Sequence, residues 1–379
     1  MRKNDYQPLG KYIEQVNVRN RDLTVTNLMG VSIEKRFIPS IANTIGTDLS
    51  PYKIVKPGQF AYGPVTSRNG DKITIALYNG NEDCIISQAY EAFRIKDTTQ
   101  LLPEYLMMWA KRPEFDRYAR YMSHGSVREL FSWEEMCNVM LPVPPIEEQR
   151  RIVSEYQTVE HRIANNEALI QKLEETAQAI YHHTFVEGID EENLPEGWRK
   201  GCLEDISESI SAGTIPVYHE SEYLVLGQKC NNNHKIDLSL CKTHIPKVSV
   251  TFLKKGDTLI NSTGNGTLGR VATVLFHPVN LAYDSNMTMV RPLEKKYSCY
   301  ISCLLKTKEK YFIELSQGST NQTRLYCSMI RPLSVLVPTD FVLEEFETRI
   351  SMLYDYTYYL QQENIHLRTL LSLLTSKLS

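Results

Sequence analysis

The most constraining feature of this 379-residue sequence is an internal repeat with a period near 195 residues. Matched pieces recur in the same order in both halves of the chain. They are LGKYI at 9–13 with CLEDI at 202–206, KPGQFAY at 56–62 with KKGDTLI at 254–260, and LPVP at 141–144 with LVP at 336–338. Because a single hydrophobic core stops growing near ~250–300 residues, the length already favours two domains. The repeat adds that these domains are copies of one unit.

Within each copy the apolar pattern predicts an α/β domain followed by one long helix. Short apolar and alternating runs predict strands at 72–78, 84–95, 271–276 and 287–292. An amphipathic helix follows the strands in each copy. It begins near Pro103, a residue suited to the first turn of a helix, and near Tyr300 in the second copy. The fold class expected is therefore α+β, with two α/β domains in tandem.

The long helices carry the strongest periodic signal, since apolar residues alternate steps of three and four as a coiled-coil seam requires. The first seam comprises Ile152, Tyr156, Val159, Ile163, Asn166, Ile170, Leu173, Ala177, Ile180 and Thr184. The second comprises Phe346, Ile350, Leu353, Thr357, Leu360, Asn364, Leu367, Leu371, Leu374 and Leu378. Either stripe alone is equally typical of an ordinary amphipathic helix on a globular core. Two matched stripes favour helices that pack on each other.

The simplest packing of two equivalent helices in one chain is an antiparallel coiled coil with a local pseudo-two-fold axis. Such a rod of about 35 residues is roughly 50 Å long and would separate the two globular copies. Asn166 and Asn364 stand at matching places in the two seams, 198 residues apart. A buried polar seam residue lowers stability but fixes register, because slippage leaves its amide unpaired. We therefore predict that this pair sets the register.

The formal charge of −3 is unevenly distributed along the chain. Residues 1–145 hold 18 basic and 16 acidic residues, and 198–340 hold 17 and 12. The helical segments 146–197 and 341–379 hold 4 against 12 and 3 against 5. Two mildly basic domains suit contact with a polyanion, whereas a Glu-rich helix is also typical of any solvated helix. The charge therefore permits nucleic-acid binding without requiring it.

The sequence favours a cytoplasmic protein without a membrane span. No stretch approaches ~18 uninterrupted apolar residues, and the start, MRKNDYQPLG, lacks the apolar core of a signal peptide. The eight cysteines form no CxxC pair, and a reducing compartment keeps such thiols free.

Motifs for catalysis, cofactors or metals are weak throughout. The GxGxxG at Gly264–Gly269 is followed by VATVLF, which favours a hairpin over the helix that a dinucleotide site needs. Cys230, His234, Cys241 and His244 lack the tight cysteine pair of common zinc sites. Asp284 with Glu294-Lys295-Lys296 resembles a nuclease carboxylate set, but the first copy has no counterpart. No NPPY, DPPY or GxxxxGK[ST] motif is present. We expect no catalytic residue, no cofactor and no metal.

Two pairs of matched loops carry side chains suited to DNA recognition. Arg bonds guanine, Asn and Gln bond adenine, and Ser or Thr reach base edges or phosphates. Turn formation alone also explains Ser, Asn and Gly at such places. The candidates are Ser67, Arg68, Asn69, Lys72, His124, Ser126 and Arg128 in copy one, and Asn261, Ser262, Thr263, Asn265, Thr267, Arg270, Gln317, Ser319, Asn321 and Arg324 in copy two.

The segments LPVPPIEEQRRIV at 141–153, LPEGWRKGCLEDI at 194–206 and INSTGNGTLGRVA at 260–272 resemble the specificity subunits of type I restriction-modification systems. The resemblance extends over essentially the whole chain. It implies two target recognition domains, each reading half of a split DNA sequence, and two conserved helices that form an antiparallel coiled coil. It also implies that methyl transfer and cleavage belong to other subunits.

Together these observations predict a non-catalytic DNA-recognition subunit. Residues 1–145 and 187–340 are expected to be target recognition domains 1 and 2, the second including an entry linker. Residues 146–186 and 341–379 are expected to be the conserved helices. The expected partners are double-stranded DNA, two modification (methyltransferase) subunits and restriction subunits, with no membrane. The alternative is a coiled-coil protein-interaction scaffold without DNA contact.

Overall fold

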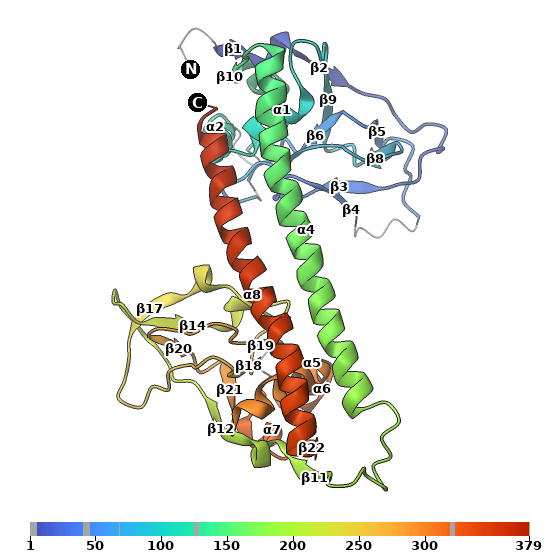
Figure 1. Cartoon of the computed structure of the whole chain (residues 1–379). Helices are drawn as coiled ribbons and strands as arrows, with labels where there is room; N and C mark the ends of the chain where they lie inside the picture. Colours follow the sequence, from blue (N-terminus) through green and yellow to red (C-terminus); the bar gives the residue numbers. More distant parts are fainter. Residues whose placement is uncertain (1–5, 41–45, 68, 125–128, 319–322, 379) are drawn as a thin grey trace. The chain divides into compact units, whose positions relative to one another are not determined.

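The computed structural model describes residues 6–40, 46–67, 69–124, 129–318 and 323–378 (Figure 1). The chain forms two compact units. Unit 1 comprises residues 1–164 and 365–379, and unit 2 comprises residues 165–364. The two long helices, α4 (Ile146–Phe185) and α8 (Asp340–Ser376), each contribute a segment to both units.

Unit 1 is built on a four-stranded antiparallel sheet with the order β2-β9-β6-β7. These strands are β2 (Ile13–Val16), β9 (Glu91–Ile95), β6 (Phe60–Tyr62) and β7 (Ile75–Leu77). Among the described residues, unit 1 also contains the strand pairs β1 (Tyr6–Pro8) with β10 (Met140–Pro142), β3 (Met29–Val31) with β4 (Phe37–Pro39) and β5 (Lys53–Val55) with β8 (Cys84–Ile86), and the helices α1 (Pro103–Ala110), α2 (Pro113–Tyr121) and α3 (Trp133–Asn138).

The core of unit 1 is rich in aromatic residues from the sheet and the helices that cover it. Phe60 and Phe93, paired across β6 and β9, stack with ring centroids 4.8 Å apart. Phe131 meets the rings of Tyr62 and Phe115 edge to face. Burying such side chains contributes about 1.5–3 kcal/mol each, so this cluster is a main source of the unit's stability.

Unit 2 repeats this sheet, with the order β12-β21-β18-β19 and the same antiparallel pairing. These strands are β12 (Ser207–Ala212), β21 (Met287–Pro292), β18 (Thr258–Asn261) and β19 (Val271–Thr273). The other elements are β11 (Arg199–Cys202) with β22 (Ser334–Val337), a second sheet of β13 (Val217–Tyr218), β17 (Lys242–Ile245), β14 (Leu224–Leu226) and β20 (Leu281–Tyr283), the hairpin β15 (Asn231–Asn232) with β16 (Lys235–Ile236), and α5 (Ser298–Thr307), α6 (Glu309–Leu315) and α7 (Cys327–Ile330).

The internal repeat is also visible in single hydrogen bonds. Tyr105 in α1 donates its hydroxyl proton to the carbonyl oxygen of Pro142 over 3.1 Å. Tyr300 in α5, 195 residues later, donates in the same way to Leu336. Both bonds tie the first helix after the sheet to the strand that leads into a long helix, so the two units share one plan down to side-chain level.

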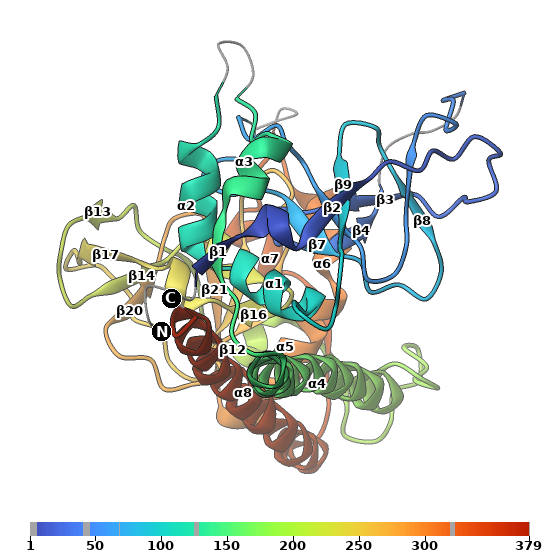
Figure 2. The same cartoon turned by 90° about the horizontal axis from the view of Figure 1, so that it is seen from above.

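In unit 2 the two long helices pack antiparallel. Asn166 contacts Asn364, whereas Tyr181, further along α4, contacts Phe346, which lies earlier in α8. In unit 1 the chain after α8 returns to the core, where Leu378 is buried in one cluster with Val153 and Tyr156. Both helices can be followed in the two views (Figure 1, Figure 2). The predicted fold class, α+β with two repeated domains, long helices and an antiparallel coiled coil, is confirmed.

Several predicted element boundaries are wrong. The run at 84–95 forms two strands, β8 and β9, because a turn at Ser87–Tyr90 redirects the chain into a different sheet. The strand predicted at 271–276 ends at Thr273. The single helix predicted to begin near Pro103 is two helices, because Pro113 lacks an amide proton and begins α2. Among the described residues no helix combines the length and apolarity that crossing a membrane requires.

Candidate nucleic-acid interface

One loop in each unit connects two neighbouring strands of the repeated sheet. Loop A1 (63–72) joins β6 to β7, and loop A2 (262–270) joins β18 to β19. Loop A2 turns on glycines: Gly264 has φ +108°, and a Cβ there would clash with Thr267 Oγ1. Gly269 has φ +84°, and its Cβ would lie 2.7 Å from the carbonyl oxygen of Glu309. The chain continues as strand β19, so the GxGxxG motif is a hairpin, as the sequence predicts.

A second loop reaches each hairpin loop from the helical side of its unit. The last residues of loop B1 (123–130) lie beside loop A1, since Thr66 donates its amide proton to the carbonyl oxygen of Glu129 over 3.0 Å. The end of loop B2 (317–324) lies beside loop A2, since the next residue, Leu325, donates its amide proton to the carbonyl oxygen of Ser262 over 2.9 Å. The structure therefore brings together, within each unit, the two loops that the sequence singles out.

The side chains at the start of loop A2 hold the loop in place. Asn261 is buried and donates to the carbonyl oxygen of Gln228 over 2.9 Å, and its own oxygen accepts from Asn231. Ser262 is buried and shares a 2.7 Å hydrogen bond with Thr288. Because both side chains are enclosed and have partners, they fix the loop and present no group to a ligand.

In the middle of loop A2 some side chains are hydrogen-bonded within the unit and others are exposed. The Thr263 hydroxyl lies 3.0 Å from the side-chain oxygens of Gln228 and Asn286. The Thr267 hydroxyl donates back to the carbonyl oxygen of Thr263. Asn265 stands exposed between them. It is the loop A2 candidate best placed to meet a partner molecule.

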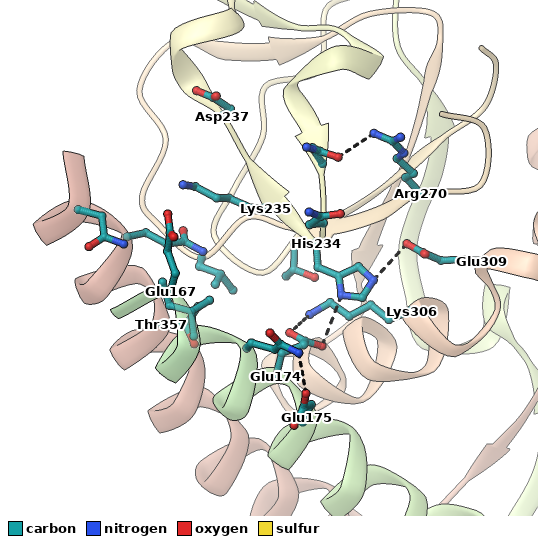
Figure 3. A pocket seen from close by; sticks show the side chains of 18 residues that line it. Glu167, Glu174, Glu175, His234, Lys235, Asp237, Arg270, Lys306, Glu309 and Thr357 are labelled. Atoms are coloured by element: carbon teal, nitrogen blue, oxygen red, sulfur yellow. Dashed lines mark hydrogen bonds and ion pairs between the residues drawn. The ribbon is translucent and has the colours of Figure 1, made fainter. Parts of the chain in front are cut away.

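Arg270 closes loop A2 and has two hydrogen bonds of its own. It donates to the side-chain oxygen of Asn232 over 2.9 Å and to the carbonyl oxygen of Gly266 over 2.8 Å (Figure 3). It also lines a cavity of about 760 Å³ between the β15–β16 hairpin, α4, α6 and α8. The guanidinium therefore braces the loop against the β15–β16 hairpin.

Loop A1 presents a more open set of side chains. Ser67 and Lys72 are exposed, and Lys72 lies 3.6 Å from the carboxylate of Glu34. Asn69 donates to the carbonyl oxygen of Val65 over 3.1 Å, a turn contact of the kind that sequence reasoning allowed. Arg68 lies outside the described residues.

The B loops are described at their ends. His124 is exposed and pairs through its backbone with Leu130. Gln317 is exposed and pairs through its backbone with Arg324, whose guanidinium donates to the carbonyl oxygen of Ser285 over 2.6 Å. Four candidates lie outside the described residues, namely Ser126, Arg128, Ser319 and Asn321.

Sequence reasoning missed the polar residues that support loop A2 from other segments. Asn286, in the turn before β21, accepts the Ser262 amide at its carbonyl oxygen over 2.7 Å. Asp284 accepts from the amide and the side chain of Asn286, although burial raises the pKa of Asp284 above its ordinary value. Asp284 is thus a turn-forming residue. No spacing rule links these residues to loop A2, because they lie beyond the next strand, β19, in a separate turn of the chain.

Of the four residues considered as zinc ligands, the thiols of Cys230 and Cys241 contact each other, but among the described residues no third ligand joins them. His244 is buried, and burial lowers its pKa. His234 lies instead between two glutamates, Glu174 and Glu309 (Figure 3). Over the described ranges, no group of three or more His, Cys, Asp or Glu side chains has the arrangement that a metal ion requires.

No family model matches the chain. It is 23% identical over 283 residues to the specificity subunit of the type I restriction enzyme MjaIX from Methanocaldococcus jannaschii. This match covers 67% of the chain and 63% of that relative, so the chain spans less than two thirds of the relative's length. In fold the chain is similar to the crystal structure of the S subunit of a type I restriction-modification system from M. genitalium, with a TM-score of 0.59, 14% identity and coverage of 100% and 97%. The resemblance seen in the sequence is confirmed.

Proposed function

We propose that this chain, as a relative of type I specificity subunits, is the non-catalytic DNA-recognition subunit of a type I restriction-modification complex. Residues 1–145 would read one half of a bipartite target and residues 187–340 the other. The observation that carries this proposal is the convergence of an A loop and a B loop beside the same four-stranded sheet in each of two units. Two similar readers in one chain suit a target of two different half-sites.

The exposed polar groups at the loops support DNA as the ligand. Unit 1 presents Ser67, Lys72 and His124, and unit 2 presents Asn265 and Gln317. Hydroxyl, amide, imidazole and ammonium groups are those that bond phosphates and base edges. The two loop-bearing segments are also the basic parts of the chain, whereas the helical segments are acidic. Phosphate contacts at the loops would then leave the helices free for protein partners.

The outer face of α8 supports the docking of modification subunits. Met352, Tyr356 and Tyr359 form a second stripe on α8, on the flank of the seam, with exposures of 63%, 45% and 61%. The rings of Tyr356 and Tyr359 stack with centroids 6.3 Å apart. Ion pairs lie on the surface of both helices, such as Arg151 with Glu148 on α4 and Arg349 with Glu345 on α8. Of the large apolar side chains described in α4, only Leu169 is exposed. Exposed Met and Tyr are enriched where proteins bind proteins, so α8 is the helix we assign to docking.

Long-read methylome sequencing of cells that express the chain with its host's modification subunit tests this function. The expected result is methylation at a non-palindromic motif in two parts, separated by a spacer of fixed length. Exchange of residues 1–145 for another recognition domain should change one part and leave the other. Absence of any bipartite methylated motif would overturn the proposal.

The alternative, a coiled-coil scaffold without DNA contact, is compatible with the α8 stripe. An electrophoretic shift of the assembled complex distinguishes the two. Affinity for DNA that falls steeply between low and raised salt indicates phosphate contacts, since each neutralised phosphate adds to the salt dependence. No shift at low salt would favour the scaffold.

A further inference from the structure

In unit 1 one carboxylate joins three elements that are distant in sequence. Lys35, at the tip of the β3–β4 hairpin, is 7% exposed, and its ammonium lies 2.8 Å from Asp116 Oδ1 in α2. The same oxygen accepts the amide proton of Ile73 over 3.1 Å. Ile73 is the residue that leads loop A1 into β7. Asp116 therefore fixes the exit of loop A1 to a helix and to a second hairpin.

Unit 2 contains the same arrangement. His234, at the tip of the β15–β16 hairpin, places Nε2 3.3 Å from Glu309 Oε1 in α6 (Figure 3). That oxygen accepts the amide proton of Val271 over 2.7 Å. Val271 is the residue that leads loop A2 into β19. The same three groups thus meet in each unit, although the side chains differ. They are a basic side chain at a hairpin tip, a carboxylate on the second helix after the sheet, and the backbone amide at the exit of the A loop.

A strained backbone also recurs at the hairpin tips. Lys35 has φ +59° and His234 has φ +59°, the left-handed region that costs a residue with a Cβ about 1 kcal/mol. Such strain persists only where surrounding contacts determine the conformation. In unit 1 Lys35, which bears it, contacts the carboxylate. In unit 2 both turn residues have positive φ, Asn233 at +50° and His234 at +59°, and His234 is the one that contacts the carboxylate.

A second repeated contact links the same helices to the long helices. Lys111, which follows α1, lies over the ring of Tyr156 in α4 at 5.2 Å, and Lys306 in α5 lies over Tyr354 in α8 at 4.7 Å. Tyr156 and Tyr354 are 198 positions apart, like the paired asparagines. Each lysine also meets a carboxylate of α4, Glu160 or Glu174, at 2.6 Å. These contacts hold α1 and α5 against the long helices. The next helices in the chain, α2 and α6, carry Asp116 and Glu309.

We infer that Asp116 and Glu309 are positioning residues for target recognition. Each sets the exit of an A loop in a frame shared with a hairpin and a helix, so that the reading side chains meet the DNA in one fixed orientation. The inference rests on the proposed function. It adds residues that touch no DNA and yet determine how sharply each half-site is read.

Glu309 is the better position for the test, because it and His234 are each about one third exposed, whereas Lys35 is buried. Glu309→Ala removes the acceptor of the Val271 amide. Glu309→Gln keeps a side-chain oxygen and should preserve the hydrogen bond from the Val271 amide. Glu314→Ala is the matched control, since Glu314 is an exposed glutamate of the same helix. All three are made in the full chain and measured in complex with the modification subunits.

The first measurement is hydrogen exchange at the Val271 amide, which we expect to be about 10-fold faster in Glu309→Ala and unchanged in Glu309→Gln. The second is the methylome. Discrimination against single mismatches, ordinarily worth ~5- to 150-fold for each base pair, should fall about 10-fold in the half-site of unit 2 and remain intact in the other. Methylation of the unchanged half-site shows that the variant folds.

The results distinguish a failure of the proposed function from a failure of the positioning role of Glu309. A wild-type chain that yields no bipartite motif overturns the proposed function and this inference with it. A wild-type motif that Glu309→Ala leaves unchanged, or relaxes equally in both halves, overturns the inference alone. The reciprocal double variant Lys35→Met with Asp116→Ala, which leaves no buried charge unpaired, should relax only the half-site of unit 1.

Discussion

Asn166 donates its side-chain amide to the side-chain oxygen of Asn364 over 2.9 Å, and both residues are buried in unit 2. Asn166 also lies 2.8 Å from the carboxylate of Glu363. The two asparagines stand 198 positions apart in the chain, at the same place in the two repeats. A hydrogen bond between equivalent residues forms at only one register of an antiparallel helix pair. A slip of one turn would bring an amide against apolar side chains.

The asparagine pair is expected to show strong coupling in unfolding experiments. Asn166→Leu leaves the Asn364 amide buried without this partner and should lower the free energy of unfolding by about 1–3 kcal/mol. Asn364→Leu should behave alike, whereas the double Leu variant should recover most of the loss. Urea unfolding of the four chains gives the coupling energy. Asn165→Leu, at an exposed neighbouring position, is the control. Additive single effects would contradict the pairing.

Two asparagines of the A2 hairpin should separate structure from recognition. Asn261→Ala removes the partners of Gln228 and Asn231 and should destabilise unit 2 by about 1–3 kcal/mol. Asn265→Ala, at the exposed tip, should change the free energy of unfolding by less than about 0.5 kcal/mol and yet relax the second half-site. Urea unfolding and the methylome measure the two effects. A stable Asn265→Ala chain with an unchanged motif would exclude Asn265 as a reader.

The outer stripe of α8 should be sensitive to charge. Tyr359→Glu places a carboxylate in the exposed apolar stripe and should weaken binding of the modification subunit at least ~10-fold. Tyrosines that become buried when two proteins bind are common hot spots of interfaces. The midpoint of unfolding should not change, because the side chain is exposed. Calorimetric titration with the purified modification subunit measures the affinity. Thr176→Glu, on the exposed face of α4, adds the same charge elsewhere. Equal weakening by both variants would argue against a specific role of α8.

Glu347 should contribute a pH dependence of opposite sign to that of an exposed ion pair. Its carboxylate is buried and accepts the amide proton of Cys299 at the start of α5 over 2.8 Å. Burial raises the pKa of Glu347 above its ordinary 4.5. The folded state therefore holds the proton more tightly than the unfolded state, and this stabilisation is lost as the pH rises from 4.5 through the folded pKa.

Comparison of the wild-type chain with Glu347→Gln tests this sign. The variant cannot ionise, so its free energy of unfolding should gain on that of the wild type as the pH rises through that window. Urea unfolding at several pH values gives the difference, with Glu344→Gln at an exposed position of the same helix as the control. A difference that stays constant or moves the other way would contradict a raised pKa.

The sequence predicted the features whose signal is periodic or local. The heptad seams identify α4 and α8 because apolar residues at steps of three and four, sustained over this length, are typical of a long helix that packs along one face. The hairpin at Gly264–Gly269 follows from glycine spacing and from the strand pattern after it. The split of 84–95 into β8 and β9 was missed, because the turn at Ser87–Tyr90 contains no glycine or proline to mark it.

The loop residues were only partly predictable, since residue type does not reveal burial. Asn261 and Asn265 look alike in the sequence, but one is enclosed by Gln228 and Asn231 while the other is exposed. Contacts between distant segments left no signal. The separation of Lys35 from Asp116 differs from that of His234 from Glu309, so no single offset between the two repeats aligns both pairs. The residue types differ as well, so nothing in the sequence marks these residues as equivalent.

The bonds from Asp116 to Ile73 and from Glu309 to Val271 use main-chain amides. Such a donor is present whatever side chain stands at these two positions, with proline the sole exception. The exposed side chains of the A loops can therefore be replaced without loss of the anchor that holds the loop exit, whereas Gly264 and Gly269 are required by the turn of loop A2. A lineage of such proteins could acquire new targets by point mutation while its loop geometry persists, and proline is the one substitution that positions 73 and 271 should never accept.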